Sequence, residues 1–303
     1  MVATVADKGE SMALRITIDL FSGRPNPSVV VTGLEERELL ERLAGTAGRG
    51  RAATTSALPA GPALGYRGLL VEPIDEHAAP AARTRKRAPR AAQRTRLRVA
   101  SAPDLEDLVC SPSGPFRAAG LEARFFDHLA AETARVRQAE GFRATARARA
   151  AAANESCACA PLWEPEWWND GGPIQAGNNC YNYAVNYRSD SYAQPGRANG
   201  AMYASISPAN VRAAALADAL LDAPLRNKCP RKGHLVALCV SDWDFHWYRK
   251  QRSGNWTHKP GPDPITQLDN ANVPITDPRT ADRGPYTRFV GFLTVLHGHV
   301  KIG

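Results

Sequence analysis

The chain has 303 residues, of which 44% are apolar, and it carries a formal net charge of +8. This length and composition suit one large or two ordinary globular domains with a real hydrophobic core. Six cysteines are too few for a disulfide scaffold in a chain of this size, so we expect most thiols to be free. No run of 18 apolar residues occurs, and this predicts a protein without a membrane partner.

The first 75 residues predict a small α+β module. Residues 14–20, LRITIDL, alternate apolar and polar side chains with the period of a half-buried strand. The turn cluster FSGRPNP follows, and residues 32–45 then place leucines on one helical face and acids in the first turn. A second strand is expected at 65–72. We find no catalytic cluster in this module.

Residues 76–103 predict a basic linker. Eight Arg and Lys side chains lie between positions 83 and 98 without any acid, and no aromatic residue stands among them to stack on bases. A solvated linker is therefore favoured over a nucleic-acid-binding arm. Residues 104–153 are rich in good helix formers and predict a helical connector.

Residues 154–303 predict helices on one side of an antiparallel sheet. One helix is expected after Asn179, and a second is indicated by Ser207 as its cap and Pro208 at its first position. Later segments alternate as strands do and are separated by turn clusters: HLVALCV, FHWYRK, NWTHK and YTRFVGFLTV. Helices followed by a strand meander are typical of the α+β class.

Cys180 lies in the polar and aromatic stretch NNCYNYAVN, at the start of the expected helix. A helix start offers unpaired backbone amides and the positive end of the helix dipole, and both stabilise a thiolate. The same amides can hold the oxyanion of a tetrahedral intermediate. Asn178 and Asn179 stand where a helix cap is wanted.

The segment FHWYRKQRSGNWTHKPG predicts a hairpin that brings two histidines together. With a turn centred on Arg252, His246 lies opposite His258 and Tyr248 opposite Trp256, all on one face. An imidazole takes the proton of a thiol, and a third polar group fixes which ring nitrogen does so. A slip of one residue in this register would separate the pair.

This order of cysteine at a helix start, histidine on a strand and a polar residue on the next strand resembles the papain-like thiol hydrolases. It is most similar to the NlpC-type and CHAP amidase and peptidase groups, in which a second polar residue follows the base histidine across a short hairpin. The resemblance implies that Cys180 is the nucleophile, His246 the base and His258 the orienting residue. It also implies an oxyanion donor, for which Gln175 and Asn179 are the candidates.

The resemblance covers roughly residues 160–300 and rests on order and spacing. NNCYNYA differs from the Asp-Cys-Ser-Gly typical of the NlpC type, and Gln175 is closer to the cysteine than the corresponding glutamine of papain. Three acids in the loop after the hairpin are alternatives to His258 as the orienting residue: Asp263, Asp269 and Asp277.

The expected function is that of a cysteine-dependent hydrolase that cleaves a peptide amide through a thioester, with cell-wall peptide as one substrate class. Two alternatives stay open: a non-catalytic peptide- or glycan-binding protein, and a thiol acyltransferase. Aromatic side chains in this half are expected to line a substrate groove. They are Trp168, Tyr181, Trp247 and Trp256.

No cofactor is expected. Zinc held by Cys157 and Cys159 together with another cysteine is the chemical alternative, but the Cys-Ala-Cys spacing lacks the usual gap of two residues. The N-terminus lacks the pattern of a secretory signal, so we expect synthesis in the cytoplasm, with export by a specialised secretion system left open.

Overall fold

The computed structural model describes residues 13–48, 64–74, 97–99, 103–111, 113–143 and 155–303. They belong to two compact units. The first lies within Met1–Asp19, Asn26–Leu58 and Gly68–Ala130, and the second within Leu20–Pro25, Pro59–Arg67 and Ala131–Gly303. The first unit thus extends beyond the expected boundary at residue 75, and part of the expected helical connector belongs to it.

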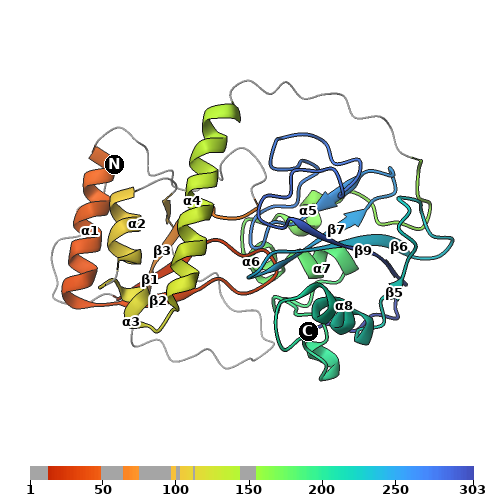
Figure 1. Cartoon of the computed structure of the whole chain (residues 1–303), viewed down its shortest axis with the longest axis horizontal. Coiled ribbons are helices and arrows are strands. Elements are labelled where there is room, and N and C mark those ends of the chain that lie inside the picture. The colour runs from red at the N-terminus through yellow and green to blue at the C-terminus, as the bar shows by residue number, and fades with distance from the viewer. Residues whose placement is uncertain (1–12, 49–63, 75–96, 100–102, 112, 144–154) are drawn as a thin grey trace. The chain divides into compact units, whose positions relative to one another are not determined.

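The first unit is built on an antiparallel four-stranded sheet in the order β2-β1-β3-β4 (Figure 1). The alternating apolar residues of β1 are buried, as the strand pattern predicts, and the expected helix and second strand correspond to α1 and β3. The elements are β1 (Ala13–Ile18), β2 (Ser28–Val31), α1 (Gly33–Gly48), β3 (Leu69–Ile74), β4 (Leu97–Val99), α2 (Pro103–Cys110), α3 (Pro115–Ala118) and the start of α4 (Ala123–Arg143).

The expected basic linker falls mostly outside the described residues. Its described residues are Leu97–Val99, which form strand β4 and pair with β3, and Pro103, the first residue of α2. A short edge strand thus lies in a segment whose composition predicted only a linker. Three residues are too few to show a periodicity, and the pairing partner lies far away in the sequence.

The second unit contains an antiparallel five-stranded sheet in the order β5-β9-β6-β7-β8, together with short helices. The α+β prediction is confirmed at this level. The elements are α5 (Pro165–Trp168), α6 (Pro173–Gly177), α7 (Cys180–Val185), the 3-10 helix η1 (Arg197–Asn199), α8 (Pro208–Ala217), β5 (Leu221–Asp222), β6 (His234–Val240), β7 (Phe245–Lys250), β8 (Trp256–His258) and β9 (Arg288–Val295).

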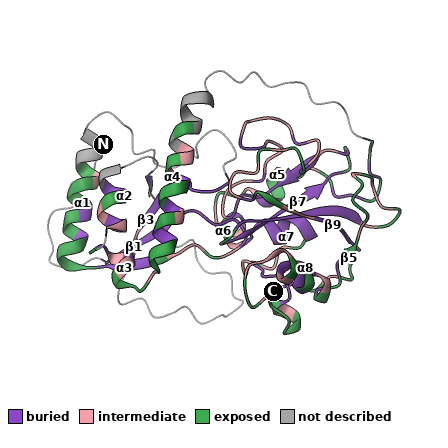
Figure 2. Ribbon diagram, viewed as in Figure 1, coloured by how far each residue is buried: buried purple, intermediate pink, exposed green. Residues whose placement is uncertain are grey.

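Alternation along β6 separates two hydrophobic clusters, one on each face of this sheet. Val236, Leu238 and Val240 pack with residues of α7 and α8, whereas Leu235 and Cys239 pack with residues of the long loop after β8. Figure 2 shows α7 and the central strands as buried almost throughout. The expected cap of α8 is present, since the Ser207 side chain accepts a hydrogen bond from the Asn210 amide.

Candidate functional site

Cys180 is the first residue of α7, and its position is set by a capping box. The Asn179 side chain accepts hydrogen bonds from the backbone amides of Tyr181 and Asn182, and the Asn182 side chain accepts one from the Asn179 amide. This arrangement fixes the chain direction at the helix start, as the sequence predicts. The Cys180 side chain is fully buried, and its sulfur lies 3.9 Å from the Phe245 carbonyl oxygen at the start of β7.

The surroundings of Cys180 favour a protonated thiol. Burial raises the pKa of Cys180 well above its ordinary value, and the charge of Asp244 raises this pKa further. A hydrogen bond from the Trp247 amide, a hydrogen bond with the Ser22 hydroxyl and the charge of Lys259 lower this pKa, but they do not outweigh burial. The thiol in this state is not poised for attack.

The two histidines meet, although not in the expected register. Tyr248 pairs with His258 and Lys250 with Trp256, so the strands are shifted by two residues from the predicted pairing. A shift of two keeps every side chain on its face, and His246 and His258 become diagonal neighbours. His246 Nε2 lies 2.9 Å from His258 Nδ1.

The hydrogen-bond partners determine where the ring protons lie. His258 Nε2 is 2.9 Å from the Leu268 carbonyl oxygen, which only accepts, so this nitrogen carries a proton. Burial lowers the pKa of both rings, that of His258 to about 4, and both are neutral. His258 Nδ1 must then accept from His246 Nε2, which leaves the lone pair of His246 Nδ1 free to accept a proton. His246 is thus oriented as a base.

The lone pair of His246 is directed at Ser22, a residue that we did not predict. Ser22 Oγ lies 2.6 Å from His246 Nδ1 and accepts a hydrogen bond from the Gly261 amide. The same hydroxyl lowers the pKa of the Cys180 thiol, so it lies close to the sulfur. The described part of the chain has no direct hydrogen bond between Cys180 and His246, so the expected thiol–imidazole contact is replaced by a contact through Ser22.

Strand geometry explains this separation. Phe245 and Trp247 point to the face of β7 that α7 covers, and His246 points to the other face. Cys180 meets β7 at residues 245–247, which extend beyond the part paired with β8. The thiol therefore lies at the unpaired edge of β7. A group that is close to both the Cys180 thiol and the His246 ring must lie at this edge, between the two faces of the strand.

Ser22 is held in place by a buried carboxylate. The Asp244 side chain accepts hydrogen bonds from the successive amides of Ser22, Gly23 and Arg24 at 2.6, 3.0 and 2.8 Å, and another from the Tyr286 hydroxyl at 2.6 Å. Burial raises the pKa of Asp244, whereas these donors lower it. Residues 22–24 of the FSGRPNP turn are thus bound through their backbone amides within the second unit, to which residues 21–25 of the turn belong.

The carbonyl oxygen of Gly23 sits between two side-chain amides. Asn179 Nδ2 donates to this oxygen at 2.7 Å, and Gln194 Nε2 donates to it at 2.8 Å. A Cβ atom at Gly23 would lie 2.4 Å from the Phe245 ring and 2.6 Å from its carbonyl oxygen, so only glycine fits. The Arg24 guanidinium donates to the Trp243 carbonyl oxygen at 2.8 Å.

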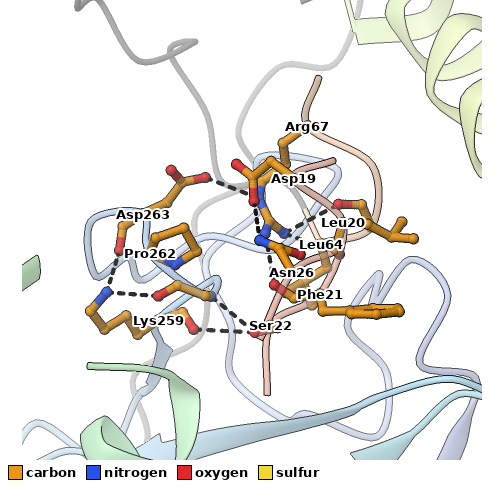
Figure 3. A network of polar contacts seen from close by, with 12 residues as sticks. Asp19, Leu20, Phe21, Ser22, Asn26, Leu64, Arg67, Lys259, Pro262 and Asp263 are labelled. Carbon is orange, nitrogen blue, oxygen red and sulfur yellow. Dashed lines mark hydrogen bonds and ion pairs between the residues drawn. The ribbon is translucent and has the colours of Figure 1, made fainter. Parts of the chain in front are cut away.

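Gln175, the expected oxyanion donor, has a different role. Its side chain donates to the Pro262 carbonyl oxygen at 3.2 Å, and its own carbonyl oxygen accepts from Lys259 Nζ at 2.6 Å. Lys259 also donates to the carbonyl oxygens of Gly261 and Asp263, and Figure 3 shows Lys259 beside Ser22. Burial lowers the pKa of this lysine to about 7. Gln175 and Lys259 thus shape the loop that covers Ser22.

The acids considered as alternatives to His258 are used elsewhere. Asp263 forms an ion pair with Arg67 at 3.2 Å, and Asp277 forms one with Arg279. Asp269 accepts hydrogen bonds from amides of its own loop. Of these candidates, His258 is the one that is hydrogen-bonded to the His246 ring.

The four aromatic side chains expected in a groove are fully buried. Tyr181 packs against Trp247 in the cluster between α7 and the sheet, Trp256 stacks on Phe292, and Trp168 lies edge-on to Tyr183. In this structure they form core, not an open groove. A sequence rich in aromatic residues does not distinguish the two, because both need large apolar side chains.

Cys157 and Cys229 form a disulfide, and the cysteines Cys110, Cys159, Cys180 and Cys239 are free. The prediction that most thiols are free is confirmed. The disulfide uses one member of the Cys-Ala-Cys pair considered for zinc, and no group of three metal-ligating side chains is found among the described residues.

Within the described residues, no helix combines the length and apolar character needed to cross a membrane. No protein-family model matches the chain, and no solved structure matches it. A curated protein of Ruditapes philippinarum, "Insoluble matrix shell protein 1", is 45% identical over 140 residues, which are 45% of this chain and 91% of that protein.

Proposed function

The chain belongs to the same family as Insoluble matrix shell protein 1 of Ruditapes philippinarum, and within that family we propose that it is a cysteine-dependent amide hydrolase. Cys180 is the nucleophile, His246 the base and His258 the orienting residue. The observation that carries the proposal is the chain of hydrogen bonds from the Leu268 carbonyl through both rings, which leaves His246 Nδ1 facing the Ser22 hydroxyl, a group that also lowers the pKa of the Cys180 thiol.

The chemistry requires a substrate peptide to displace residues 20–25 and the Cys180 side chain to turn toward His246. His246 Nδ1 then accepts the thiol proton, the sulfur adds to the carbonyl carbon, and the amine leaves with that proton as a thioester forms. Water then adds to the thioester with His246 as base, which releases the acid and restores the thiol. Peptide amides, including those of cell-wall peptide, are the proposed substrates.

The arrangement of the second unit supports a papain-like fold as the finer assignment. A cysteine at the start of α7 precedes an antiparallel sheet, and the two histidines lie on its adjacent strands β7 and β8. The Cys157–Cys229 disulfide supports work in an oxidising compartment after export, since disulfides persist there.

The test is release of new amino groups from a mixture of unstructured peptides by the full chain. Because the site is covered, the assay uses both the wild-type chain and Arg24→Ala, which loses the bond to the Trp243 carbonyl oxygen. In the more active background, Cys180→Ala and His246→Ala should each reduce the rate by about 10³-fold or more. Cys239→Ala is the comparison at an equally buried thiol, which lies opposite His246 across the β6–β7 pair, and it should leave the rate unchanged.

Two results would overturn the proposal. One is the absence of hydrolysis in both backgrounds. The other is activity that survives Cys180→Ala but is lost in Ser22→Ala, since Ser22 would then be the nucleophile. A product that carries an added amine acceptor in place of water would change the reaction to acyl transfer.

A structural, non-catalytic role is the second candidate, because the family relative is named as an insoluble matrix protein and the thiol is fully buried. In this role the relay only fixes the turn, and the expected observation is concentration-dependent sedimentation of the full chain that Cys180→Ala does not alter. A chain that stays soluble at all concentrations would contradict it.

A further inference from the structure

The segment Ser22–Arg24 is bound in the way that a peptide ligand would be bound. Its three successive amides donate to Asp244, and the carbonyl oxygen of Gly23 accepts from Asn179 and Gln194. All of these partners belong to the second unit. The segment is therefore bound mainly through its backbone groups, as peptides are in many enzymes that bind them.

Two side-chain amides hold the Gly23 carbonyl oxygen, and one of them comes from the residue next to Cys180 in the chain. Asn179 immediately precedes Cys180, so one donor is fixed to the residue next to the thiol by the capping box. Gln194 is fixed from its other side, since its side-chain oxygen accepts a hydrogen bond from the Tyr203 hydroxyl. Both amides are almost fully buried, and each donates to the Gly23 carbonyl oxygen as well as to the Ala193 carbonyl oxygen.

We propose that Asn179 and Gln194 form the acyl-oxygen subsite of the hydrolase, and that Ser22-Gly23-Arg24 occupies it as an internal mimic of a glycyl-arginyl peptide substrate. The assignment of this subsite to a hydrolase rests on the proposed function. The class of peptide that it binds is inferred separately, from the contacts of Ser22–Arg24. Phe245 selects glycine at the carbonyl-bearing position. The carbonyl oxygen of Trp243 selects a following arginine through its guanidinium, whereas Asp244 holds the amide of that residue whatever its side chain.

The internal segment Ser22–Arg24 also explains why the Cys180 thiol is inaccessible to solvent. The Ser22 hydroxyl donates a hydrogen bond to His246 Nδ1 and lies close to the Cys180 thiol. The side chains of Cys180 and His246 are both fully buried. A substrate peptide must displace residues 20–25 to reach the site. On the other side of Ser22, Arg67 donates to the Phe21 carbonyl oxygen at 2.8 Å, so the segment is held at both ends (Figure 3).

Alkylation of Cys180 by iodoacetamide, followed by peptide mass spectrometry on the full chain, measures this cover. Gly23→Ala forces a methyl group into Phe245 and should raise the alkylation rate of Cys180 at least about tenfold, with Cys239 unchanged. Gly177→Ala is the matched control, because a Cβ there makes only ordinary contacts of 3.6 Å or more. If Gly23→Ala does not fold, Arg24→Ala should still give about a tenfold rise.

The ligand class is tested on the opened variant with the free peptide DLFSGRPNP, the sequence of residues 19–27. This peptide should restore slow alkylation of Cys180, whereas DLFSARPNP should not, and DLFSGAPNP should protect at least about tenfold less well. Alkylation as slow in the opened variants as in the wild type would overturn the inference. So would equal protection by the glycine and alanine peptides.

These readouts report accessibility and binding, so they separate this inference from the proposed reaction. Protection without any hydrolysis would leave the peptide subsite standing and remove the hydrolase. Hydrolysis of other peptides without protection by DLFSGRPNP would support the hydrolase and refute the proposed peptide subsite.

Discussion

Asp244→Ala tests whether one buried carboxylate holds Ser22–Arg24 in place within the second unit. The substitution leaves the amides of Ser22, Gly23 and Arg24 and the Tyr286 hydroxyl without their acceptor. Each buried donor left unsatisfied costs about 1–3 kcal/mol, and relaxation lets water or a neighbour satisfy some of them. We expect the free energy of unfolding to fall by about 4 kcal/mol in total.

Thermal unfolding followed by near-ultraviolet circular dichroism measures this change in the right unit, because all six tryptophans lie between residues 163 and 256. For a domain of this size, a loss of about 4 kcal/mol corresponds to a decrease in Tm of roughly 8–16 °C. Asp242→Ala is the control two residues away. Its exposed side chain pairs with Arg288 at 2.8 Å, and such surface pairs contribute less than about 1 kcal/mol.

The outcome that refutes this reasoning is a Tm of Asp244→Ala within about 2 °C of the wild type, or a decrease equal to that of Asp242→Ala. Either result would mean that the turn is not held by its amides. The closed state of Cys180 would then need another explanation.

Two further predictions concern pH and redox state. Burial lowers the pKa of His258 to about 4 and that of His234 to about 3. Between these values and about pH 6.5 the unfolded chain binds more protons than the folded chain, so the free energy of unfolding must decrease as the pH is lowered through this window. His258 alone should contribute about 3 kcal/mol of this loss between pH 7 and 4, measured by urea unfolding, and a His258→Gln chain with an unchanged pH slope would contradict the assignment. Reduction of the Cys157–Cys229 disulfide, which joins residues 72 positions apart, should lower the free energy of unfolding by about 2–4 kcal/mol, whereas Cys159→Ser at an exposed free thiol should not. Equal unfolding curves with and without reductant would refute the second expectation.

Local patterns in the sequence were enough for much of the second unit. The caps of α7 and α8 are formed by Asn179 and Ser207, which are residue types that cap helices wherever they occur. The buried run HLVALCV gave β6, and the two histidines were placed on adjacent strands with the correct face. Their register was wrong by two, because the turn of residues 251–255 is longer than a tight hairpin and its length is not encoded in the strand alternation.

Whatever depends on contacts between distant segments was decided by the tertiary structure alone. Ser22 and Gln194 carry no local signal, and they reach the site from segments more than 170 residues apart. Composition assigned the aromatic side chains to a groove because it does not report whether a surface is covered. The sequence determined the elements and the residue types of the site, since those depend on neighbours in the chain. Only folding brought the turn onto Asp244 and placed a hydroxyl between thiol and imidazole, because that arrangement depends on long-range hydrogen bonds.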